Sequence, residues 1–289
     1  MPTFDGYAIP VKYTQKLADH TFVLSSDGRV WPCGGRSDPN EDGAKHIIVN
    51  VQGHPAVAYC CSLPLPALKA GIKIVVTGVC HQISNRLLLT SLRNVWDAKG
   101  SRASYLLYGV YGRSFNDFFI RYAYCSAINL NPAAAPALAS ANALQGDDGS
   151  GGDRDGSFIK DIIKVFMSYL NKEGSEKLID DPYANSDLIV DEFKVMVKHS
   201  LGESYDAAKV ASLAQLRVSL FKNTEEFLKK VAAKNGDPKD LAGKINAELA
   251  KTLASMQESL GKEDFERLFG HPETDIEVVD SEMLAESFK

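Results

Sequence analysis

The fold is decided first by residues 20–31, HTFVLSSDGRVW. The run His20–Leu24 is apolar and rich in strand-forming residues, and Ser25–Gly28 is typical of a tight turn. Arg29–Trp31 then supplies a second short strand. These residues predict a β-hairpin near the N-terminus.

Two further strands and a helix are predicted beyond the hairpin. The runs His46–Val51 and Ile72–Val76 are rich in β-branched residues, which favours strands, and the polar, Gly-rich segment 33–43 is predicted to be a surface loop. Behind the second run, the bend Thr77–Val79 leads into apolar residues at helical spacing. We therefore expect a helix to begin near Cys80.

The segment that follows is harder to interpret. Tyr105–Tyr111 reads as a possible strand, and Phe115–Tyr124 is rich in aromatic residues and fits a strand or a helix equally well. Residues 131–156 carry too little apolar bulk to offset the entropy of ordering them. This segment is predicted to be a flexible linker or loop.

Beyond residue 156 the sequence predicts helices. Apolar residues recur at spacings of three and four, with start signals at Ser157, Ser186 and Asp237-Pro238. The helical segments are Phe158–Asn171, Ser186–Leu201, Asp206–Ala233 and Pro238–Leu260. The predicted class is α+β: an antiparallel sheet with a packed helix in a domain at 1–130, the linker at 131–156, and a mostly helical domain at 157–289.

Composition limits the classes of partner. The chain has 289 residues and a formal net charge of −5, so it lacks the basic field that a nucleic acid would require. No apolar run approaches the roughly 18 residues of a membrane span, and residues 1–19 contain no apolar core of a signal peptide. We expect a cytoplasmic protein, or one exported without a signal peptide.

The five cysteines are Cys33, Cys60, Cys61, Cys80 and Cys125. Their odd number and the absence of C-x-x-C pairs predict free thiols. Cys33, His46, His54 and Cys60 match no standard zinc spacing, and the phosphate-loop and dinucleotide fingerprints are absent, so neither a metal nor a cofactor is expected.

Cys80 has the most favourable position for chemistry. The first turn of a helix stabilises a thiolate through unpaired N–H groups and the positive end of the helix dipole, and the same groups can stabilise an oxyanion. A base is still required, and His20 stands at the start of an apolar strand upstream. Cys33, in its Gly-rich loop, is a competing nucleophile.

The order of these residues carries a resemblance to a known family. Asp19–Leu24 with its hairpin, followed by Gly78-Val79-Cys80-His81-Gln82 at the start of a helix, resembles the circularly permuted papain-like hydrolases. That group contains permuted NlpC-type peptidases and lecithin:retinol acyltransferase-like enzymes. The likeness covers the first third to two-fifths of the chain.

The resemblance implies a papain-like sheet and a set of site residues. Cys80 would be the nucleophile and His20 the general base, and the third residue, which orients the histidine, would be His46 or Asp38. The implied reaction is cleavage or transfer at an amide bond of a peptide or cell-wall peptide, through a thioester.

Other readings of these residues stay open. Trp31, Gln82 and Asn85 are candidate substrate contacts, because the two amides are three residues apart on the predicted helix. Cys80 could instead be a small core residue and His20 a structural histidine. The chain would then be a non-catalytic interaction module whose helical domain binds a protein partner. A third reading is an antibacterial amidase effector delivered by a secretion system.

Overall fold

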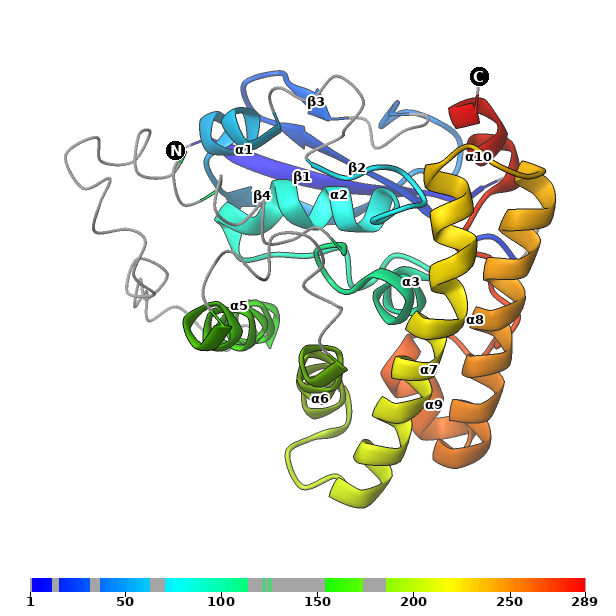
Figure 1. Ribbon diagram of the computed structural model, residues 1–289. Helices are drawn as coiled ribbons and strands as arrows, with labels where there is room; N and C mark the ends of the chain where they lie inside the picture. The colour runs from blue at the N-terminus through cyan, green and yellow to red at the C-terminus, as the bar shows by residue number, and fades with distance from the viewer. Residues whose placement is uncertain are drawn as a thin grey trace.

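The computed structural model describes residues 2–11, 16–31, 37–62, 71–113, 122, 125, 154–173 and 186–288. A four-stranded antiparallel sheet forms one end of the molecule, and most of the other described residues lie in helices (Figure 1). The predicted α+β class is confirmed.

The sheet is built from residues 3–52. Its strands are β1 (Thr3–Ile9), β2 (His20–Ser25), β3 (Val30–Trp31) and β4 (Lys45–Gln52), in the order β3-β2-β1-β4. The predicted hairpin is confirmed, because Leu24 pairs with Val30 and Val23 with Trp31. The predicted strand at 46–51 corresponds to β4. Sequence reasoning missed β1, where Asp5-Gly6 interrupts the apolar alternation.

The strand predicted at Ile72–Val76 is wrong. These residues form a turn, in which the Val75 N–H donates to the Gly78 carbonyl at 2.7 Å and the Val76 N–H donates to Lys73 at 3.0 Å. Val75 adopts a left-handed backbone with φ +65°. Its N–H is bonded within the turn, and its carbonyl accepts from the Tyr108 hydroxyl at 2.7 Å, so neither group pairs with a neighbouring strand.

The helices between the sheet and the C-terminal half are α1 (Pro55–Ser62), α2 (Cys80–Leu87) and α3 (Ser101–Tyr108). The prediction that a helix begins at Cys80 is confirmed. The possible strand at 105–111 is wrong, since Tyr105 to Tyr108 lie in α3 and all four are fully buried. A helix covered on every side can be apolar all round, so its sequence shows no helical period.

The four helices predicted in the C-terminal half are confirmed, and two further helices follow them. The four predicted helices are α5 (Arg154–Glu173), α6 (Ser186–Leu201), α7 (Ala207–Ala232) and α8 (Pro238–Leu260). The two further helices are α9 (Lys262–Phe269) and α10 (Ser281–Phe288). Asp206 and Asp237 cap α7 and α8 by accepting hydrogen bonds from first-turn N–H groups. The predicted linker lies outside the described residues up to 153, and residues 154–156 belong to α5.

The sheet, α2 and the C-terminal helices are stacked in layers. In Figure 1, α2 lies directly beneath the sheet, and α7 and α8 run side by side along one flank of the molecule. The Thr21 and Ser84 hydroxyls, 2.9 Å apart, join β2 to α2. Val23, from the same face of β2 as Thr21, is also buried.

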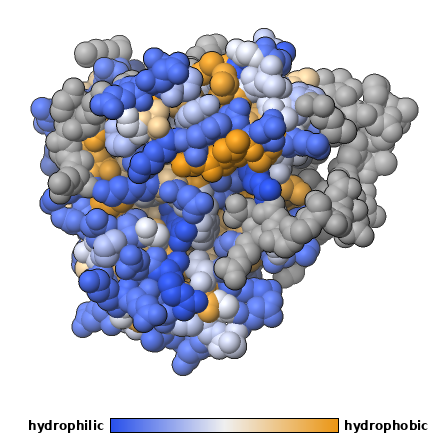
Figure 2. All heavy atoms as spheres, turned by 180° about the vertical axis from the view of Figure 1, so that it is seen from behind, coloured by the Kyte–Doolittle hydropathy of each residue, from blue (hydrophilic) through white to orange (hydrophobic). Residues whose placement is uncertain are grey.

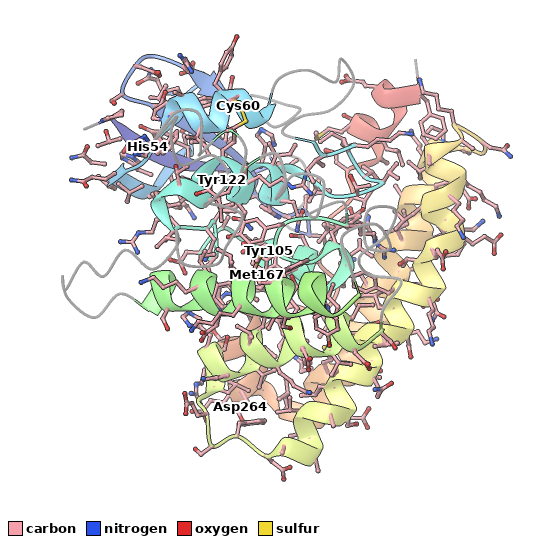
Figure 3. The ribbon with its side chains drawn as sticks, turned by 60° about the vertical axis from the view of Figure 1, so that its left-hand side comes forward. His54, Cys60, Tyr105, Tyr122, Met167 and Asp264 are labelled. Carbon is pink, nitrogen blue, oxygen red and sulfur yellow. A yellow bond between two sulfur atoms is a disulfide. The ribbon has the colours of Figure 1, made fainter. Side chains whose placement is uncertain are left out.

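A buried ion pair joins the N-terminal layers to the C-terminal helices. Arg217 of α7 bonds to Glu192 of α6, and both side chains are fully buried. The Arg217 guanidinium also donates to the Tyr105 carbonyl at 3.0 Å, and Glu192 accepts a bond from the Val110 N–H at 2.9 Å. Figure 3 shows Tyr105 between the layers. The guanidinium therefore supplies a donor to a carbonyl in the last turn of α3.

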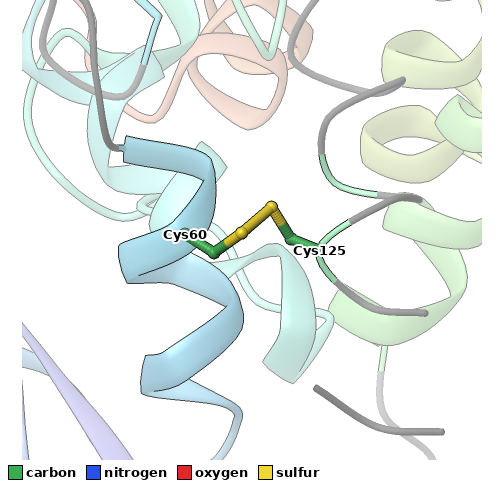
Figure 4. The surroundings of a disulfide bond; sticks show 2 residues. All are labelled: Cys60 and Cys125. Atoms are coloured by element: carbon green, nitrogen blue, oxygen red, sulfur yellow. A yellow bond between two sulfur atoms is a disulfide. The ribbon is translucent and has the colours of Figure 1, made fainter. Parts of the chain in front are cut away.

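The prediction of five free thiols is wrong for two of them. Cys60, in α1, forms a disulfide with Cys125, 65 residues away in sequence (Figure 4). Cys80 is a free cysteine. Cys33 and the side chain of Cys61 lie outside the described residues. Pairing depends on how the fold brings distant segments together, which an odd number of cysteines cannot reveal.

Candidate functional site

The N-terminus of α2 is fixed by a buried amide. The N-cap residue is Val79, whose N–H donates to the Gln82 side-chain oxygen at 3.0 Å. The Gln82 amide nitrogen donates to the Ser104 hydroxyl and to the Gly109 carbonyl, each at 3.0 Å. Gln82, a predicted substrate contact, is fully buried and holds the start of α2 in place.

The Cys80 thiol is partly buried against the beginning of β2. Its sulfur donates a weak hydrogen bond to the Asp19 carbonyl at 3.8 Å. Burial raises the pKa of the Cys80 thiol, although hydrogen bonds from Thr21 and from the N–H groups of Cys80 and His81 oppose the rise. The expectation that the helix N-terminus would give a low thiol pKa is therefore wrong for this conformation, and a base has to remove the proton.

His20 and Cys80 line the same cavity. The cavity has a volume of about 40 Å³ and lies between the start of β2 and the start of α2. His20 is the first residue of β2, pairs with Ile9 of β1, and is 5% exposed. By strand alternation His20 shares a face with Phe22, whereas Thr21 faces α2. The catalytic pairing of His20 with Cys80 stays a prediction, supported by the cavity that they share.

His81 is a buried group of the site whose importance sequence reasoning missed. Its Nε2 lies 2.9 Å from the Asp19 carbonyl and its Nδ1 lies 3.1 Å from the Ser104 hydroxyl. Burial lowers the pKa of His81 to about 4, so the ring is neutral near pH 7 and donates from Nε2. His81 is buried and lines the cavity beside Cys80. The ring ties the residue before His20 to α2, and the sequence offers no signal for this beyond adjacency to Cys80.

The two candidates for the third catalytic residue lie elsewhere. His46, on β4, stacks on Tyr7 with ring centroids 4.5 Å apart, and its Nε2 lies 2.9 Å from an Asp5 carboxylate oxygen. Tyr7 belongs to β1, which separates β4 from β2. Asp38 accepts a bond from the Asn40 N–H at 2.8 Å and so stabilises a local turn. Neither residue lines the cavity.

Trp31 and Asn85, the other predicted substrate contacts, are also placed away from the cavity. Trp31 packs against Phe4 with ring centroids 5.7 Å apart. The Asn85 amide donates to the Val110 carbonyl at 2.8 Å and accepts from the Val95 N–H at 2.9 Å. Its polar groups therefore connect α2 to the segment around α3.

Several general properties complete the description of the site. Among the described residues, no group of three or more His, Cys, Asp or Glu side chains is arranged to hold a metal ion. In the same part of the chain, no helix is long and apolar enough to cross a membrane. The face seen in Figure 2 is largely hydrophilic, with apolar side chains gathered in small patches.

Comparison of the chain with protein-family models, with curated proteins and with solved structures gives no match.

Proposed function

We propose that the protein is a thiol-dependent hydrolase or acyltransferase that acts on an amide bond of a peptide or cell-wall peptide. The observation that supports this proposal is the position of Cys80. It occupies the first turn of α2, packed over the beginning of β2, and shares a cavity with His20. Thioester chemistry requires a thiol near N–H groups and within reach of a base, and the shared cavity brings Cys80 and His20 to the same space.

In the proposed reaction, His20 takes the proton of the Cys80 thiol as the sulfur attacks the carbonyl carbon of the amide. The negative charge on the carbonyl oxygen is stabilised by first-turn N–H groups of α2. The C–N bond then breaks, and the amine leaves with the proton from His20. Water, or an acceptor amine or alcohol, attacks the thioester and restores the free thiol.

Specific observations favour a second candidate, a non-catalytic interaction protein in which Cys80 is a core thiol. The sulfur is hydrogen-bonded to the Asp19 carbonyl, its pKa is raised, and the adjoining cavity is small. In that case the helices from α5 onward would supply the surface that binds a partner.

The test is amide hydrolysis by matched variants. Release of free amine would be followed on a panel of peptides and cell-wall stem peptides for the wild type, Cys80→Ala, His20→Ala and the control His54→Ala. We expect the first two variants to lose about a thousandfold or more of any activity, because nucleophile and base act as a unit. Circular dichroism would show that both remain folded, and an active Cys80→Ala protein would contradict the proposal.

The same assay addresses the third residue. His46→Ala and Asp38→Ala should retain activity, because His46 is hydrogen-bonded to Asp5 of the neighbouring strand β1 and Asp38 holds a local turn. A large loss of activity in either variant would show that the residue takes part in catalysis.

A further inference from the structure

The cavity beside Cys80 is closed on one side by the C-terminal strap, which we define as residues 275–284. Four residues of this segment line the cavity together with Cys80 and His20: Glu277, Val278, Asp280 and Met283. The strap includes the first residues of α10, which packs against α8 near the end of the sheet (Figure 1). A segment almost two hundred residues downstream of Cys80 in sequence therefore forms a wall of the proposed site.

The first anchor of the strap is a short backbone pairing with the segment that precedes His20. The Glu277 N–H donates to the Lys16 carbonyl at 2.7 Å, and the Ala18 N–H donates to the Glu277 carbonyl at 2.8 Å. These bonds form an isolated parallel bridge between Leu17 and Glu277. The strap is thus bonded to Ala18, which is two residues before the predicted base His20 in the sequence.

The second anchor is a single side chain of α8. The Asn246 amide donates to the Val279 carbonyl at 2.8 Å and accepts from the N–H groups of Val278 and Val279 at 3.1 and 3.0 Å. Asn246 does not line the cavity, so changing it replaces none of the side chains around Cys80. Buried apolar side chains of the strap, Ile276 and Leu284 among them, complete its attachment.

The size of the cavity gives these anchors a functional meaning. A volume of about 40 Å³ holds roughly three water molecules at most. Sites that bind small molecules enclose several hundred Å³. We infer that the C-terminal strap is an occluding lid, which has to leave the cavity before a peptide-like substrate can reach Cys80. This inference rests on the proposed function and adds a means of regulating it.

The strap is a short segment at the C-terminal end of the described chain, so it should open more readily than the whole chain unfolds. Opening would also relieve the burial of the Cys80 thiol. The closed protein is therefore the resting form of the proposed site.

Site-resolved labelling tests the inference. The wild type and variants would be treated with N-ethylmaleimide or with a bulky polyethylene-glycol maleimide, and the labelling of Cys80 would be followed by peptide mass mapping. In the wild type we expect the bulky reagent to react much more slowly than the small one. Asn246→Ala removes three buried hydrogen bonds and should raise the rate with the bulky reagent by about tenfold or more.

The matched control is Asn223→Ala, which removes an exposed hydrogen bond between α7 and Glu248 of α8 and leaves the strap untouched. Its labelling rate should equal that of the wild type. If Asn246→Ala does not fold, Glu277→Pro provides the same test, because proline lacks the N–H that donates to Lys16. It should likewise accelerate labelling with the bulky reagent.

Two results would overturn the inference. One is a wild-type Cys80 that reacts with the bulky reagent as fast as the urea-unfolded chain does. The other is a folded Asn246→Ala or Glu277→Pro protein whose labelling rate is unchanged. Because this readout needs no turnover, size-dependent labelling without amide hydrolysis would reject the proposed function and leave the lid in place.

Discussion

Helices α2 and α8 are both packed into the core, but by opposite means. All of α2 after Cys80 is buried, and most of these residues are polar: His81, Gln82, Ser84, Asn85 and Arg86. In α8 a mainly apolar stripe is buried and the opposite face is polar. Apolar packing tolerates small shifts, whereas hydrogen bonds require matched positions. The difference indicates that α2 is built to hold its first residue, Cys80, at one place.

Acid should affect α2 before it affects α8. The folded chain keeps His81 neutral down to a pKa of about 4, whereas in the unfolded chain the ring takes up a proton near its ordinary pKa of 6.5. Between these pH values the unfolded chain binds more protons, so stability is complete above about pH 6.5 and falls as the pH is lowered. We expect a loss on the order of 3 kcal/mol from this ring, measured by urea unfolding at a series of pH values.

Burial also lowers the pKa of His271, which adds to the loss in the same direction. His81→Gln, whose amide can still donate to the Asp19 carbonyl, should reduce the slope of the profile between pH 6.5 and 4 and leave the smaller contribution of His271. Leu249→Ala in α8 should lower stability by a similar amount at every pH, since it removes no titrating group. A wild-type profile that is flat over this window would break the comparison.

Exchanging the packing of a single residue should give a smaller effect. Asn85→Leu keeps the side-chain volume but leaves the Val95 N–H and the Val110 carbonyl unpaired in the core. The expected cost is about 2 kcal/mol in the free energy of unfolding. The like-for-like control in α8, Leu249→Met, should cost about 1 kcal/mol or less. Equal costs for the two variants would show that the hydrogen bonds of α2 contribute no more than apolar contact.

The smallest effect is expected at the start of α8. Asp237 accepts a hydrogen bond from the Lys239 N–H at 3.0 Å, so Asp237→Ala should lower stability by about 1 kcal/mol. Asp237→Asn, which keeps the accepting oxygen, should recover most of the loss. Thermal unfolding of the three proteins measures the difference, and an equally unstable Asp237→Asn variant would assign the effect to charge instead.

The two helices also differ in how well sequence reasoning could find their surroundings. The bounds of α8 were predicted because its cap, its proline and its apolar period are local signals, and α6 was predicted for similar reasons. The start of α2 followed from the bend at Thr77–Val79. The hydrogen-bond partners of α2 could not be predicted. Gln82 and Asn85 donate to the Gly109 and Val110 carbonyls, which lie in a segment that the sequence wrongly predicts to be a strand.

The candidate site was predictable in the same partial way. Cys80 and His20 were singled out by their order and local context, and they do share a cavity. The closing of that cavity by Glu277 and Met283 could not be foreseen, because it depends on a contact between distant segments. The disulfide of Cys60 escaped for the same reason.

The disulfide gives the chain a closed covalent ring. Cys60 and Cys125 are 65 residues apart, and Cys80, all of α2 and all of α3 lie between them. A protease that cuts one peptide bond within this ring would open the loop without separating the pieces. On a gel the nicked protein would run as a single chain until a reducing agent is added, and as two fragments afterwards.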